Sequence, residues 1–146
     1  ALLAAVLVAD LEQILRQFAN ALGPDAPFEE QLLHLVRPGY TFWGKRPALS
    51  RVLLKEMWFL KGPWADRLRA LERRGQEGVV ALLASAREQG QLRPDADLEL
   101  AARTGFAFYL NTIVGALDSP AYDIEAMIED TRRFFRQLMA GIGAGR

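Results

Sequence analysis

Hydrophobic residues recur every three to four positions along the chain, and no segment sustains an alternation of apolar and polar residues. The first pattern is typical of helices that bury one face, whereas half-buried strands need the second. Residues that end or open helices divide the pattern into six segments, at Gly23-Pro24, Pro47, Gly62-Pro63, Gly90 with Pro94, and Pro120. The sequence therefore predicts an all-α protein of six helices.

The predicted helices cover about 2–22, 28–44, 47–60, 64–89, 96–117 and 123–142. Pro38-Gly39 lies inside the second helix and predicts a kink or break there. Gly90 tolerates the left-handed conformation that closes a helix, so the fourth helix is expected to end beside it. Asp95 or Asp97 can then cap the fifth helix, and Asp123 the sixth.

Composition and charge narrow the possible functions. A chain of 146 residues suits one domain with a single core. Its 18 Lys and Arg residues balance 18 Asp and Glu residues, so no net field favours nucleic acid or an acidic membrane. No apolar run approaches the roughly 20 residues that span a bilayer, so we expect a cytoplasmic protein without membrane contact.

Groups for catalysis or metal binding are scarce. His34 is the single histidine and Cys is absent, which excludes a histidine pair for a metal, disulfides and thiolate chemistry. The carboxylates lie at predicted helix starts or on solvated faces, where the helix dipole explains them. We therefore expect no enzyme activity, no metal site and no cofactor.

Aromatic residues are concentrated in the second helix, the third helix and the start of the fourth. This region holds Tyr40, Phe42, Trp43, Trp58, Phe59 and Trp64, and Phe18, Phe106, Phe108 and Tyr109 could meet it from the first and fifth helices. One interpretation is a packed aromatic core. The other is an apolar ligand pocket with a few polar groups such as His34, Arg37 or Asn111. The residues alone leave both open.

The last two predicted helices carry more apolar surface than one domain can cover. The sixth has a wide stripe that doubles at positions 127/128, 134/135 and 138/139, and the fifth is apolar on most sides. Small residues such as Gly105 and Gly115 would let another helix approach closely. We therefore expect a second copy of the chain to cover these helices, as a two-fold dimer.

Three stretches resemble the C-terminal regulatory domain of TetR-family transcriptional regulators. They are the junction EQGQLRPDADLELAARTGFAFYL at 88–110, the preceding ERRGQEGVVALLASARE from Glu72, and ALLAAVL at 1–7, which is similar to the start of the family's linking helix. The resemblance extends over essentially the whole chain. It implies a single effector-binding and dimerisation domain over 1–146, whose N-terminal helix-turn-helix domain is missing.

The resemblance also implies a homodimer, a cavity and an allosteric role. The last two helices would form a four-helix bundle with those of a second chain, through Phe108, Thr112, Gly115, Met127, Phe134, Phe135 and Leu138. A small hydrophobic or aromatic effector would bind among Phe18, His34, Tyr40, Trp43, Trp58, Phe106 and Tyr109, with Phe18 sensing occupancy. It would shift the first helix and so control DNA binding by the missing domain.

A different class of protein remains as an alternative. The chain could be a helical homodimerisation or protein-interaction module whose aromatic residues are packed core and which binds no small molecule. An open cavity would separate the two hypotheses.

Overall fold

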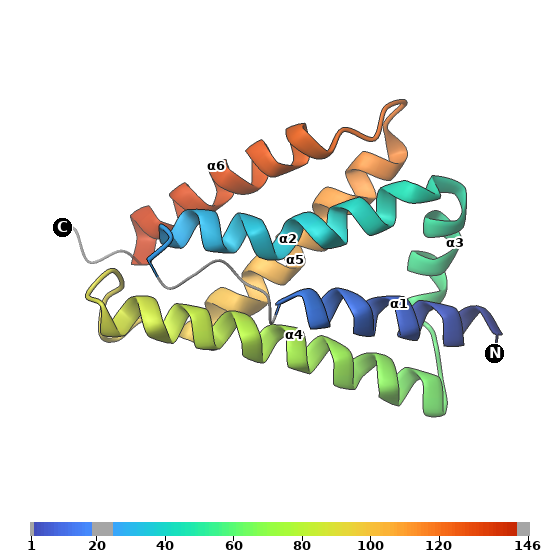
Figure 1. Ribbon diagram of the computed structural model, residues 1–146, viewed down its shortest axis with the longest axis horizontal. Helices are drawn as coiled ribbons and strands as arrows, with labels where there is room; N and C mark the ends of the chain where they lie inside the picture. Colours follow the sequence, from blue (N-terminus) through green and yellow to red (C-terminus); the bar gives the residue numbers. More distant parts are fainter. Residues whose placement is uncertain (1, 19–24, 143–146) are drawn as a thin grey trace.

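The computed structural model describes residues 2–18 and 25–142. Within these ranges the chain forms six helices and no strand, so the predicted all-α class is confirmed (Figure 1). The helices are α1 (Leu2–Phe18), α2 (Phe28–Lys45), α3 (Pro47–Met57), α4 (Pro63–Glu88), α5 (Leu98–Asp118) and α6 (Ile124–Ile142).

Helix α5 crosses the middle of the molecule and contacts α2, α3, α4 and α6 (Figure 1). Two helix pairs lie on either side of it, α2 with α6 and α1 with α4, and α1 also contacts α2. The short helix α3 covers one end, near the start of α1 (Figure 1). This arrangement places helices from all parts of the chain around one central helix.

The helix ends follow from local chemistry. At the end of α4, Gly90 has a φ of 77°, the Gln91 N–H donates to the Ala86 carbonyl at 2.9 Å, and the Gly90 N–H donates to the Arg87 carbonyl at 3.0 Å. This is a Schellman motif, which needs a left-handed residue that glycine supplies without strain. The Asp97 carboxylate then caps α5 by accepting from the Leu100 N–H at 3.0 Å. The turn predicted between these helices is confirmed.

Two predicted features differ in the structure. A kink or a break was predicted at Pro38, and the structure excludes the break, because helix α2 continues through this residue. Leu33 and Trp43 are buried on either side of this proline, so packing holds both halves of the helix although a ladder hydrogen bond is lost. Helix α3 ends at Met57, three residues before the predicted Leu60. The predicted end of the first helix at Leu22 lies outside the described residues.

Buried side chains form two clusters. The main core contains Leu7, Leu33, Tyr40, Trp43, Leu53, Leu54, Ile113, Leu117, Met127 and Ile128. The second core, at the turn from α4 to α5, contains Leu83, Ala86, Leu92, Ala96, Leu98, Ala101 and Ala102. Its turn residue Leu92 is only 1% exposed, so the turn itself closes that end. The molecule therefore has two packed cores, and a binding site could lie between them.

Candidate functional site

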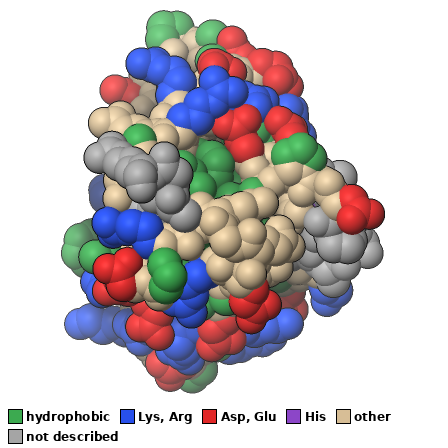
Figure 2. Space-filling view, turned by 90° about the vertical axis from the view of Figure 1, so that its left-hand side faces the viewer, with side chains coloured by type: hydrophobic (Ala, Val, Ile, Leu, Met, Phe, Trp, Pro, Cys, Tyr) green, Lys and Arg blue, Asp and Glu red, His purple; other side chains and the backbone are tan. Residues whose placement is uncertain are grey.

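A cavity of about 190 Å³ joins the two cores. Tyr40 and Trp43 of the main core and Ala102 of the second core line it, together with residues of α1, α4 and α6. Figure 2 views the end of the molecule where α4 passes into α5, and hydrophobic side chains line a hollow in the middle of that face. A concave, mostly apolar space of this kind is the usual form of a small-molecule site.

Aromatic side chains form one wall of the cavity. They are Tyr40, Trp43, Phe106, Phe108, Tyr109 and Phe134, from α2, α5 and α6. The rings are ordered by one another: Tyr40 and Tyr109 stack at 5.2 Å between centroids, and Phe108 and Phe134 stack at 4.2 Å. Such pairs hold each ring in one orientation. The wall is therefore built of aromatic rings that pack against one another.

Hydrogen bonds fix Tyr40 at the centre of this wall. Its hydroxyl lies 2.7 Å from the Thr131 hydroxyl, which donates its own hydrogen to the Met127 carbonyl at 2.8 Å. Tyr40 is therefore the donor to Thr131. The Tyr122 hydroxyl donates to the Tyr40 carbonyl at 2.6 Å. Burial raises the pKa of the Tyr40 phenol, so it stays neutral at physiological pH.

Gly39 allows the neighbouring ring of Tyr109 to reach α2. A Cβ at position 39 would collide with the Tyr109 hydroxyl and lie 2.9 Å from its Cζ. Burial raises the pKa of Tyr109, which also keeps this phenol uncharged. The aromatic wall thus depends on a missing side chain in α2.

The opposite wall is aliphatic and comes from α1 and α4. Leu11, Ile14 and Leu15 of α1 and Leu68, Leu71, Gly75 and Val79 of α4 line it. Leu68, Leu71, Gly75 and Val79 follow the helical spacing of an inward face in the sequence, but none of them was among the predicted pocket residues. Spacing could identify the inward face of α4, but it could not show that the facing helices leave a gap.

Polar side chains in the lining are few. Glu72 and Gln76 come from α4, and Thr131 comes from α6. Burial raises the pKa of the Glu72 carboxyl, while the nearby Arg69 acts in the opposite direction. None of these three residues was among the predicted site residues. In the sequence, the spacing of hydrophobic residues did not distinguish Glu72 from the other acidic residues of α4.

The structure brings together four of the seven predicted pocket residues. Tyr40, Trp43, Phe106 and Tyr109 line the cavity. Trp58 does not, because it follows the end of α3 and is 68% exposed. Its assignment to the pocket is wrong, since most of its side chain lies in solvent and it is absent from the lining.

His34 also lies away from the cavity. It borders a second hollow of about 340 Å³ between α1 and α2, with Arg37, Thr41 and Lys45 among its neighbours. This hollow is larger, but exposed polar side chains line much of it, so the aromatic cavity is the better candidate site. The side chain of Phe18 lies outside the described residues.

The predicted interface residues divide into three groups. Met127 and Phe135 are 4% and 5% exposed, so they pack inside their own chain and cannot form a contact surface. Phe108 and Phe134 line the cavity. The remaining three, Thr112, Gly115 and Leu138, are partly buried or exposed.

Helix α5 presents a different face to the outside. Its exposed positions include Leu100, Thr104, Ala107, Asn111 and Val114, which recur at intervals of three and four residues. Leu100 and Val114 are more than half exposed. The wide apolar stripe of α6, in contrast, serves the interior of the molecule.

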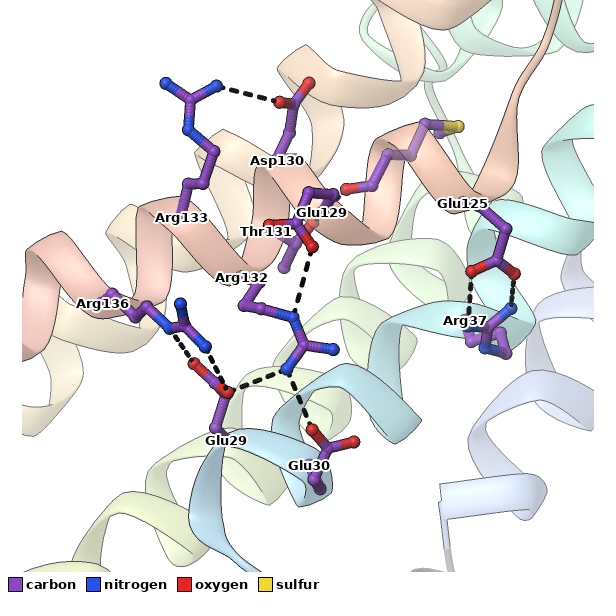
Figure 3. Close-up of polar contacts among 11 residues, drawn as sticks. Glu29, Glu30, Arg37, Glu125, Glu129, Asp130, Thr131, Arg132, Arg133 and Arg136 are labelled. Carbon is purple, nitrogen blue, oxygen red and sulfur yellow. Dashed lines mark hydrogen bonds and ion pairs between the residues drawn. The ribbon is translucent and has the colours of Figure 1, made fainter.

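Charged residues join α2 to α6 beside the cavity (Figure 3). Glu29 accepts from Arg132 and from Arg136, each at 2.8 Å, and Arg132 also reaches Glu30 at 2.9 Å. The hydrogen bond from Arg136 is the main reason that the pKa of Glu29 lies below its ordinary value, although burial opposes this shift. These pairs fix the start of α2 against α6.

The described residues offer neither a metal site nor a membrane span. They contain no group of three or more His, Asp or Glu side chains placed to hold a metal ion. None of the helices found within 2–18 and 25–142 combines the length and the hydropathy that crossing a bilayer requires.

Comparison with known proteins identifies the fold through one similar structure, whereas the sequence comparisons find no match. No protein-family model matches the sequence, and no curated protein matches it. The structure is similar to that of the ketosteroid transcriptional regulator KstR2 of Mycobacterium tuberculosis, with a TM-score of 0.61 at 18% sequence identity. The similarity covers 91% of this chain and 65% of that one. The chain has the all-α fold of the TetR regulatory domain.

Proposed function

We propose that this chain is the effector-binding and dimerisation domain of a TetR-like transcriptional regulator. The observation that carries the proposal is the aromatic cavity of about 190 Å³ inside a fold similar to that of a transcriptional regulator. The effector is a small hydrophobic or aromatic molecule, because rings and aliphatic side chains make up nearly all of the lining. Catalytic chemistry has no part in the proposal.

The allosteric step runs through α1. Leu11, Ile14 and Leu15 line the cavity, so an occupant touches this helix directly. A helix-turn-helix domain preceding residue 1 would bind DNA in the cytoplasm, and movement of α1 would change its position. The effector controls operator binding only if it binds one position of α1 more tightly than the other.

Fluorescence of Trp43 tests the effector part of the proposal. The double variant Trp58→Phe, Trp64→Phe leaves Trp43 as the single tryptophan, and Trp43 lines the cavity. Titration with the neutral aromatic compound 4-phenylbutan-1-ol is expected to change its emission saturably. The matched variant Trp43→Phe, Trp64→Phe, which keeps the exposed Trp58, should show no saturable change. Equal responses from both variants would contradict a cavity site and favour the interaction-module alternative.

The dimer is the second part of the proposal. The exposed face of α5, with Leu100 and Val114, is the apolar surface that a second copy would cover, together with the predicted Gly115 and Thr112. Leu138 of α6 would lie at its edge. Sedimentation at micromolar concentration should give twice the 16.3 kDa chain mass. Val114→Glu should give a monomer, whereas a wild-type monomer would contradict the dimer.

A further inference from the structure

The described lining of the cavity contains one acidic side chain and no basic one. Glu72 is the one carboxylate in its lining, and none of the described lining residues is Lys, Arg or His. An anionic occupant would therefore meet a like charge and no compensating cation. A neutral occupant would find the Glu72 carboxylate and the Gln76 amide as hydrogen-bonding groups on a wall that is otherwise aliphatic.

Within residues 2–18 and 25–142, Glu72 has no partner at ion-pair distance. No arginine or lysine among the described residues lies within 4.0 Å of its carboxylate, and the nearby Arg69 reaches Asp66 at 3.4 Å instead. Other carboxylates between helices are paired in two cases, Glu12 with Arg67 at 3.1 Å and Glu29 with Arg136 at 2.8 Å. A half-buried carboxylate without a cation is unfavourable, and its raised pKa reflects this.

The facing wall suits the same kind of ligand independently of Glu72. Aromatic faces attract cations through the negative charge above each ring, and the attraction is stronger where water is excluded. Tyr40, Trp43 and Tyr109 line the cavity, so their rings are available for such an attraction. The cavity thus combines an unpaired carboxylate on α4 with aromatic rings on α2 and α5.

We propose that the effector is a hydrophobic amine, whose protonated nitrogen donates to the Glu72 carboxylate while its apolar body lies against the aromatic wall. This inference rests on the proposed effector-binding function and specifies the chemical class of the effector. Binding supplies the missing partner of Glu72, and it involves no covalent step. A charge-assisted hydrogen bond of this kind is worth on the order of a tenfold difference in affinity.

Three compounds with one apolar body test the inference: 4-phenylbutylamine, 4-phenylbutan-1-ol and 4-phenylbutyrate. Their dissociation constants are measured at pH 7 through Trp43 in the Trp58→Phe, Trp64→Phe background. We expect the amine to bind roughly tenfold more tightly than the alcohol, and the carboxylate more weakly than both. Glu72→Gln should remove the advantage of the amine and leave the affinity of the alcohol unchanged.

The control variant is Glu77→Gln, on the exposed side of the same helix and outside the cavity lining. It should leave all three affinities unchanged. Glu72→Gln should fold at least as stably as the wild type, since it removes an unfavourable buried charge, and thermal unfolding checks this. Equal binding of amine and alcohol, or an equal loss of both in Glu72→Gln, would overturn the amine assignment but keep the proposed function. Failure of all three compounds to bind would overturn both.

Discussion

Helix α2 has two sides that differ in how completely they are filled. Towards α6, Tyr40 bonds to Thr131, and Glu29 bonds to Arg132 and Arg136. Towards α1 and α4, the same helix borders a cavity of about 190 Å³. The contacts with α6 fix the position of Tyr40, and the ring of Tyr40 also lines the cavity. The cavity wall is therefore rigid because α2 packs tightly against α6. Variants of α2 can test whether a residue supports this packing, the cavity or both.

Trp43→Ala should have the largest effect, because Trp43 is 2% exposed and belongs to both the main core and the cavity wall. Loss of a buried tryptophan side chain costs about 3–5 kcal/mol of stability. Trp58→Ala is the matched control, and with 68% exposure it should stay within about 0.5 kcal/mol of wild type. Urea denaturation measures both. Equal losses would show that Trp58 is packed as firmly as Trp43, against the structure.

Gly39→Ala should have the next largest effect, since its Cβ would displace Tyr109. Overpacking costs about 1–3 kcal/mol, which exceeds the gain in helix propensity of up to about 1 kcal/mol. The displaced ring can move only into the open side, so binding of 4-phenylbutan-1-ol should weaken as well. Gly78→Ala, where a Cβ meets nothing within 4 Å, should stabilise α4 slightly. A Gly39→Ala variant with wild-type stability and unchanged binding would contradict the prediction that a side chain at position 39 displaces Tyr109.

Tyr40→Phe isolates one hydrogen bond of the filled side. The variant keeps the ring that stacks on Tyr109 and removes only the donor to Thr131. Thr131 still donates to Met127, so one bond is lost, and we expect a loss of about 1 kcal/mol. Urea denaturation measures it. Unchanged stability would mean that the hydroxyl does not hold Tyr40 against α6.

The smallest expected effect is a pH dependence from Glu29. Its pKa in the folded protein is lower than the ordinary 4.5, so its ionised form stabilises the fold above pH 4.5. That stabilisation is lost as the pH falls through the folded pKa. Glu29→Gln should therefore melt a few degrees below wild type at pH 7, and the difference should vanish in acid. Glu56→Gln, an exposed control in α3, should show no such difference. A difference that persists in acid would mean that packing, and not charge, explains the effect.

Local sequence was sufficient for the helices and for most of the ends that the structure describes. The positions of Gly90 and Asp97 predicted the turn between α4 and α5, because the left-handed residue and the cap depend on neighbouring residues alone. Where distant packing competes with a local signal, prediction was wrong. Pro38 predicted a kink or a break, and the helix does not break there, because Leu33 and Trp43 are buried on either side of it.

The candidate site was predicted in part for the same reason. Aromatic content pointed to Tyr40, Trp43, Phe106 and Tyr109, which do line the cavity. Composition could not show that Trp58 follows the end of α3 and is exposed, nor that Glu72 belongs to the cavity lining. Similarly, the spacing on α6 identified a wide apolar stripe, but Met127 and Phe135 use it within their own chain.

The sequence by itself therefore determined the all-α class, the number of helices and most of their ends, because periodicity and capping act over a few residues. Only the tertiary structure decided which apolar faces meet, where they leave a cavity and which charge lies inside it. Those properties depend on the volume left between side chains that are distant in the sequence, and no pattern within one helix contains that volume.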